Sequence, residues 1–167
     1  MILLQRVTTE YVDAEDRMRL TAADAEGVAV QLWVTQRMLN RLLPHLFAWL
    51  ERQAGEGEHA VMMQEFAQQA ARDALEPSAP VAAATGGACR LCHEVDFVPR
   101  DLAVGLTFKV LGDDGESRAV GTCMFASRPL RQWLSILGDQ FAKAEWPRTA
   151  WPDWFTPAAP TSTTSLH

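Results

Sequence analysis

The chain has 167 residues, of which 48% are hydrophobic and 22% are charged, a size and composition typical of one soluble globular domain. Its 21 acidic and 15 basic side chains give a net charge of −6, which repels phosphate backbones and disfavours nucleic acid as a direct partner. Nowhere do eighteen apolar residues run together, so the sequence predicts no transmembrane helix and no membrane partner.

The first part of the chain is predicted to form three short strands separated by acidic turns. They cover residues 2–12 (ILLQRVTTEYV), 17–23 (RMRLTAA) and 28–34 (VAVQLWV). The first segment has no basic leader and meets polar residues at Gln5 and Arg6, too soon for the apolar run of a secretory signal. We therefore expect no export signal and a cytoplasmic protein.

Two helices are predicted next. Thr35 is placed to cap a helix over residues 35–53, and Pro44 should kink or divide it because proline removes a backbone hydrogen bond. Its apolar stripe consists of Leu39, Leu42, Leu43, Leu46 and Leu50. A second helix is expected over residues 59–76, with a face that we assign to the core: Val61, Met62, Phe66, Ala70 and Ala74.

The pattern then recurs after a connection rich in small residues, 77–88, which is predicted to be flexible and too short to separate two domains. Three strands are expected over residues 89–98, 103–111 and 118–126, and they lead into a helix capped by Ser127. The apolar residues of this helix are Leu130, Trp133, Leu134, Leu137 and Phe141. We equate Thr35 and Ser127 as the capping residues of the two junctions between strand and helix, a likeness that reflects either a duplication or the common chemistry of a capped helix.

The stretch CRLCH, residues 89–93, has the C-x-x-C-H spacing of c-type haem attachment. Haem is disfavoured because the chain carries no visible export signal and the segment leads into a strand. Zinc is the other cofactor hypothesis, with Cys89, Cys92, His93 and Cys123 as ligands, but an extended strand turns Cys89 and Cys92 to opposite faces. We therefore predict no metal and no cofactor, and we read the cysteines as small buried residues.

Four large aromatic residues, Trp146, Trp151, Trp154 and Phe155, lie close together near the end of the chain. Three nearby prolines exclude a continuous helix, and leaving four such rings in water would be costly. Two interpretations remain open. The segment either folds back as a strap over its own domain, or its aromatic side chains are interaction residues that dock on a partner or a neighbouring subunit.

Taken together, the elements predict an α+β fold of order βββ-αα-βββ-α, an antiparallel β-sandwich of about six strands with an inserted helical hairpin and a C-terminal helix. One domain covers residues 1–157, and residues 158–167 form a flexible tail. This order resembles the head domain shared by the scaffold proteins of DNA end joining and the cartwheel protein of centrioles. The resemblance spans about residues 1–143 and is densest at GTCMFASRPLRQWL, residues 121–134. It implies a sandwich and a non-catalytic interaction module.

Three functional hypotheses follow from these observations. The first is a non-enzymatic protein-interaction or assembly module that binds a protein partner or itself, with no catalytic residue. The second is a small-ligand binder or enzyme whose polar groups converge only in three dimensions, with His45, His59 and His93 as acid–base candidates. The third is a zinc or haem protein built on CRLCH.

Overall fold

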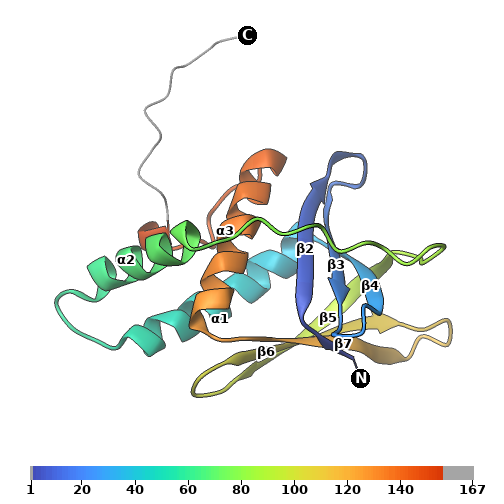
Figure 1. Cartoon of the computed structure of the whole chain (residues 1–167), viewed down its shortest axis with the longest axis horizontal. Coiled ribbons are helices and arrows are strands. Elements are labelled where there is room, and N and C mark those ends of the chain that lie inside the picture. Colours follow the sequence, from blue (N-terminus) through green and yellow to red (C-terminus); the bar gives the residue numbers. More distant parts are fainter. Residues whose placement is uncertain (1, 156–167) are drawn as a thin grey trace, which may run out of the picture.

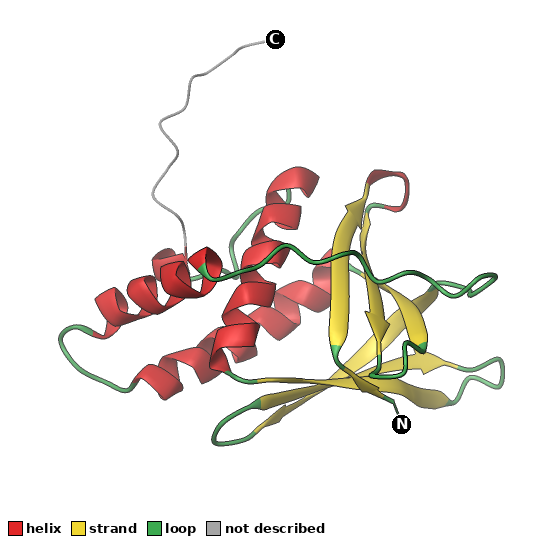
Figure 2. Ribbon diagram, viewed as in Figure 1, coloured by secondary structure: helices red, strands yellow, loops and turns green. Residues whose placement is uncertain are grey.

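A computed structural model describes residues 2–155 and shows an α+β fold with a nearly barrel-shaped sheet beside three α-helices (Figures 1 and 2). The expected tail, residues 158–167, lies outside the described residues. The strands are β1 (Leu3–Leu4), β2 (Arg6–Val12), β3 (Arg17–Ala23), β4 (Ala29–Val34), β5 (Arg90–Pro99), β6 (Val104–Leu111) and β7 (Ser117–Phe125). The α-helices are α1 (Gln36–Ala54), α2 (Ala60–Asp73) and α3 (Ser127–Ala144), and 3-10 turns lie at η1 (Asp13–Glu15) and η2 (Asp153–Phe155).

The seven strands form one mixed sheet of order β1-β7-β6-β5-β4-β3-β2. Two antiparallel units, β2-β3-β4 and β5-β6-β7, are joined by a parallel contact between β4 and β5. The antiparallel six-stranded sandwich expected from the sequence is therefore not confirmed. The sheet differs from the prediction in two places: β4 and β5 pair in parallel, and the first predicted strand is divided into β1 and β2, which pair with different strands.

Gln5 is the point where this first segment changes partner. Before it, β1 pairs in parallel with β7, and after it β2 runs antiparallel to β3. The same short stretch of chain thus links both ends of the sheet and bends it towards a barrel. Gly121 on β7 allows this closure, because a Cβ atom there would lie 2.7 Å from Leu4 Cδ1.

The helix α1 begins as predicted, because the Thr35 hydroxyl accepts a hydrogen bond from the Met38 backbone N–H at 3.2 Å. All five leucines of its predicted stripe are buried. Pro44 does not divide the helix, which runs unbroken past it with the proline ring on the exposed side.

The helix α3 buries its predicted apolar residues but starts differently from α1. Ser127 is its first helical residue, and the N-cap is Ala126, which has no side chain able to accept a hydrogen bond. The proposed equivalence of Thr35 and Ser127 as capping residues is therefore wrong. A gap-free alignment of the two junctions places Thr35 opposite Ala126, so the helices begin at equivalent positions but only α1 has a side-chain cap.

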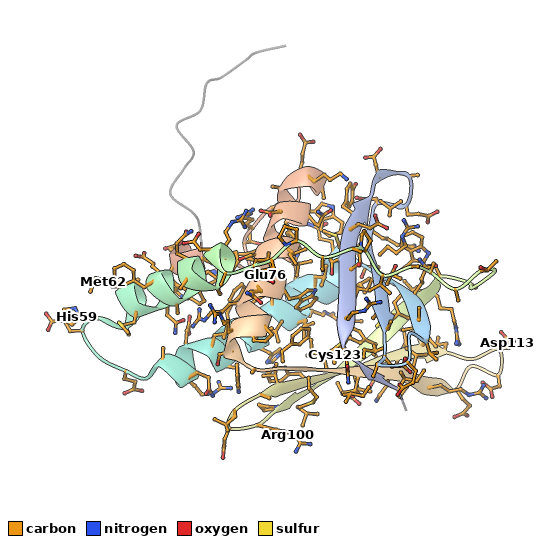
Figure 3. The ribbon with its side chains drawn as sticks, viewed as in Figure 1. His59, Met62, Glu76, Arg100, Asp113 and Cys123 are labelled. Carbon is orange, nitrogen blue, oxygen red and sulfur yellow. The ribbon has the colours of Figure 1, made fainter. Side chains whose placement is uncertain are left out.

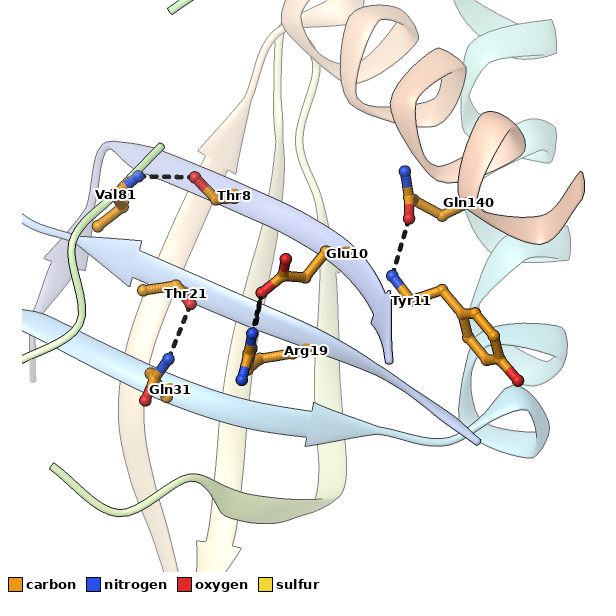
Figure 4. A network of polar contacts seen from close by, with 8 residues as sticks. All are labelled: Thr8, Glu10, Tyr11, Arg19, Thr21, Gln31, Val81 and Gln140. Carbon is orange, nitrogen blue, oxygen red and sulfur yellow. Dashed lines mark hydrogen bonds and ion pairs between the residues drawn. The ribbon is translucent and has the colours of Figure 1, made fainter. Parts of the chain in front are cut away.

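Polar contacts fix the sheet to its surroundings at β2 (Figure 4). The Tyr11 backbone N–H donates to Gln140 Oε1 on α3 at 2.8 Å. On the same strand, Thr8 Oγ1 accepts from the Val81 backbone N–H at 2.8 Å, and the Val81 side chain is buried. The connection between α2 and β5 is thus held against β2 at one point, although the sequence predicted a flexible segment.

Within residues 2–155, no helix is both long and apolar enough to span a membrane.

Candidate interaction surface

The structure separates the residues of the CRLCH stretch instead of gathering them. Cys92 is buried on β5 and lies within 3.3 Å of the Glu94 carbonyl oxygen, whereas His93 Nε2 lies 2.9 Å from Ser117 Oγ in an exposed contact. A bulge between Cys92 and Glu94 causes this division, because it inserts His93 into the strand without a partner on β6. Among the described residues, no group of three or more His, Cys, Asp or Glu side chains is placed to hold a metal ion.

The three cysteines are thiols in environments that disfavour the thiolate. Burial raises the pKa of Cys89 and of Cys92, and it raises the pKa of Cys123 to about 12. The thiolate is the reactive form and the ligand form of cysteine, so these shifts oppose both nucleophilic chemistry and metal binding.

We expect the folded protein at pH 8 to alkylate first at half-buried Cys89, while Cys92 and Cys123 react only when the chain unfolds. Cys123 should be the slowest, because its raised pKa leaves almost no thiolate at that pH. Mass spectrometry of peptides after timed alkylation, with and without guanidinium, measures the three rates. Modification of folded Cys123 at the rate of a free thiol would contradict this assignment.

The three candidate histidines lie on different elements with different neighbours. His45 on α1 packs against Phe97 with ring centroids 5.6 Å apart, His93 contacts Ser117, and His59 precedes α2 on the exposed surface. The structure therefore does not bring them together into one acid–base site.

The aromatic residues near the end of the chain fold back onto their own domain. Trp146, Trp151, Trp154 and Phe155 are each at most 8% exposed. Phe47 on α1 lies at the centre of the group, with ring centroids 5.3–5.6 Å from those of Trp151, Trp154 and Phe155. These side chains are covered within the chain, so the interaction candidates chosen from the sequence do not form an exposed docking surface.

Several large apolar side chains are instead exposed together on α2, where the predicted burial is wrong. Phe66 is 64% exposed, Met63 55% and Met62 44%, whereas Gln64, Gln68 and Ala71 form the buried side of the helix. Figure 3 shows Met62 and His59 on the side of the molecule that is away from the sheet. We define the α2 outer face by its exposed residues at helical spacing: His59, Met62, Met63, Phe66, Ala70 and Asp73.

A buried arginine explains why α2 turns its glutamines inward. Arg131 on α3 is 5% exposed, and its Nη2 donates to Gln64 Oε1 at 2.5 Å. Gln68 Nε2 donates to the Arg131 carbonyl oxygen at 2.8 Å and to Ser135 Oγ at 2.9 Å. The Arg131 guanidinium also lies over the ring of Trp154, 5.5 Å from its centroid.

This cation has amide partners rather than a carboxylate. In the part of the chain that the structure describes, no Asp or Glu lies within ion-pair distance of Arg131. Burial accordingly lowers its pKa. Because a buried charge must keep its hydrogen-bond partners, Gln64 and Gln68 are held facing α3 and the apolar side chains of α2 are left outside.

A cleft of about 630 Å³ opens beside this network, between the end of α1 and the start of α2. Its wall combines acidic Glu51 and Glu56 with Arg52, Gln64 and Trp154. Trp154 is fixed there by donating from Nε1 to Glu51 Oε1 at 3.1 Å. None of the three candidate histidines belongs to this wall, so the cleft does not supply the acid–base site considered from the sequence.

Comparisons of the chain with protein-family models, curated proteins and solved structures gave no match. Sequence reasoning missed the α2 outer face, and the overlooked signal was the pair Gln64 and Gln68, spaced four residues apart on the side of α2 that the structure buries.

Proposed function

We propose that this protein is a non-enzymatic interaction or assembly module that binds a protein partner through the α2 outer face. The observation that carries this proposal is the exposure of Met62, Met63 and Phe66 on one side of a single helix. Single exposed apolar residues are common on protein surfaces, but neighbouring large ones typically mark interaction sites. Methionine suits such a site because its flexible, polarisable side chain adapts to a partner.

The α2 outer face is also fixed in place. Turning Met62 and Phe66 into the core would rotate Gln64 and Gln68 away from Arg131 and leave a buried charge without its partners. The apolar side chains are thus presented by a helix that cannot bury them without breaking the network. A rigidly presented helical face binds with little loss of conformational entropy.

Other features support the same proposal. The net charge of −6 makes a protein a better direct partner than nucleic acid. The resemblance to head domains of assembly scaffolds favours a module that joins protein subunits, in the cytoplasm and without catalysis.

Photo-crosslinking in the native host tests the proposal. A photoreactive amino acid is placed at Met62 and, as the matched control, at Leu102, which is 82% exposed at the turn between β5 and β6. We expect protein adducts from position 62 that disappear when Phe66→Glu is added, and none of these adducts from position 102. Absence of adducts at position 62, or their persistence with Phe66→Glu, would contradict the assignment of the α2 outer face.

A further inference from the structure

We infer that the partner of the α2 outer face is a second copy of this chain, and that the two α2 helices pack antiparallel around Phe66. This inference rests on the proposed function and adds the identity of the partner and the register of the contact. A symmetric dimer requires a surface that is complementary to itself. The α2 outer face meets this requirement in the size of its side chains and in their charge.

The size pattern is the first argument. Met62 lies four residues before Phe66, and Ala70 lies four residues after it. When two copies run antiparallel with their Phe66 side chains facing each other, each large Met62 meets the small Ala70 of the other copy. Large residues opposite small ones let two helices approach closely, so the pairing fills the space that alanine leaves.

The charge pattern is the second argument, and it selects the same register. His59 lies seven residues before Phe66, and Asp73 lies seven residues after it, both exposed. Within one chain these residues are fourteen positions apart on a helix, or about 21 Å, so they do not meet. In the antiparallel pair each His59 faces the Asp73 of the other copy, where imidazole can donate a hydrogen bond to the carboxylate.

The surface area of the contact determines how tightly the two copies should associate. One face of α2, a helix of 14 residues, is smaller than the surface of about 1,200–2,000 Å² buried in stable complexes. We therefore expect a reversible dimer that forms at high protein concentration. Polar Gln69 and acidic Glu65 at the sides of the face keep it soluble when it is unpaired.

Sedimentation velocity of the purified full chain over a concentration series tests the dimer. We expect dimerisation by the wild type and at least about tenfold weaker association for Phe66→Glu, which places two buried carboxylates face to face. Leu102→Glu is the control and should dimerise like the wild type. Both side chains are largely exposed in the monomer, so neither substitution should change the melting temperature measured at low protein concentration, where the monomer predominates. A wild type that stays monomeric throughout, or dimers that survive Phe66→Glu, would overturn the inference.

A charge exchange tests the register. Asp73→Lys and His59→Glu should each weaken the dimer, because the lysine removes the carboxylate that accepts from His59 of the other copy and the glutamate places a second carboxylate opposite Asp73. The double variant His59→Glu/Asp73→Lys should recover the wild-type affinity. Recovery requires contact between chains, since the two positions lie too far apart within one helix. Failure of the double variant to recover would reject the antiparallel register centred on Phe66.

The two proposals can fail separately. A monomeric wild type whose Met62 position crosslinks a different protein, in a manner abolished by Phe66→Glu, would reject the second copy and retain the interaction module. A monomer without any crosslink at position 62 would reject both.

Discussion

Replacing Trp151 with alanine is expected to lower the free energy of unfolding by about 3–5 kcal/mol, a large part of the stability of a domain of this size. The ring is 7% exposed and packs against Phe47, Phe141 and Phe155 with centroid distances of 4.7–5.3 Å. It also lies against the backbone of α3 at Gly138, where a Cβ atom would come within 3.5 Å of it. Its removal would leave a cavity among rigid rings that cannot collapse to fill it.

The matched control is Phe66→Ala, which removes a large aromatic side chain from a position that is 64% exposed. We expect this substitution to change the free energy of unfolding by less than about 0.5 kcal/mol. Urea unfolding of both variants at low protein concentration, where the monomer predominates, measures the difference. Equal stability losses would show that the aromatic segment does not form part of the core.

Deleting all residues after Lys143 should lower the free energy of unfolding by more than Trp151→Ala does, because it removes all four buried rings.

Gln64→Leu is expected to destabilise the protein by about 3 kcal/mol, although it replaces a polar buried residue with an apolar one of similar size. The substitution removes the closest acceptor of the Arg131 guanidinium and the donor to the Leu50 carbonyl oxygen. The cation would stay buried at the interface of α2 and α3 with one fewer partner. The free energy of unfolding, from guanidinium or urea titration, measures this effect.

Arg131→Met should cost less than Gln64→Leu, since it removes the buried charge together with its need for partners. Adding Arg131→Met to Gln64→Leu is therefore expected to restore stability relative to Gln64→Leu alone. Gln69→Leu provides the control, because Gln69 is an exposed glutamine on the same helix and should tolerate the change. Additive losses in the double variant would mean that Arg131 does not depend on Gln64.

The stripes of α1 and α3 were predictable from the sequence because their apolar residues recur at helical spacing and form the buried side of each helix. The strand positions followed from short apolar runs between turn residues. The closure of the sheet did not follow, because a change of partner at Gln5 leaves no local pattern. The fold-back of the aromatic segment was one of two interpretations that composition left open, since both bury the rings.

The orientation of α2 was decided by tertiary structure alone. Its sequence contains one side rich in large apolar residues, and local periodicity assigns that side to the core. Arg131 on α3, which lies 67 residues from Gln64 in the chain, reverses this assignment. A buried guanidinium requires hydrogen-bond acceptors more strongly than two methionines and a phenylalanine require burial. The sequence by itself therefore determined which segments are helices and strands, and the partners of Arg131 determined which face of α2 meets the solvent.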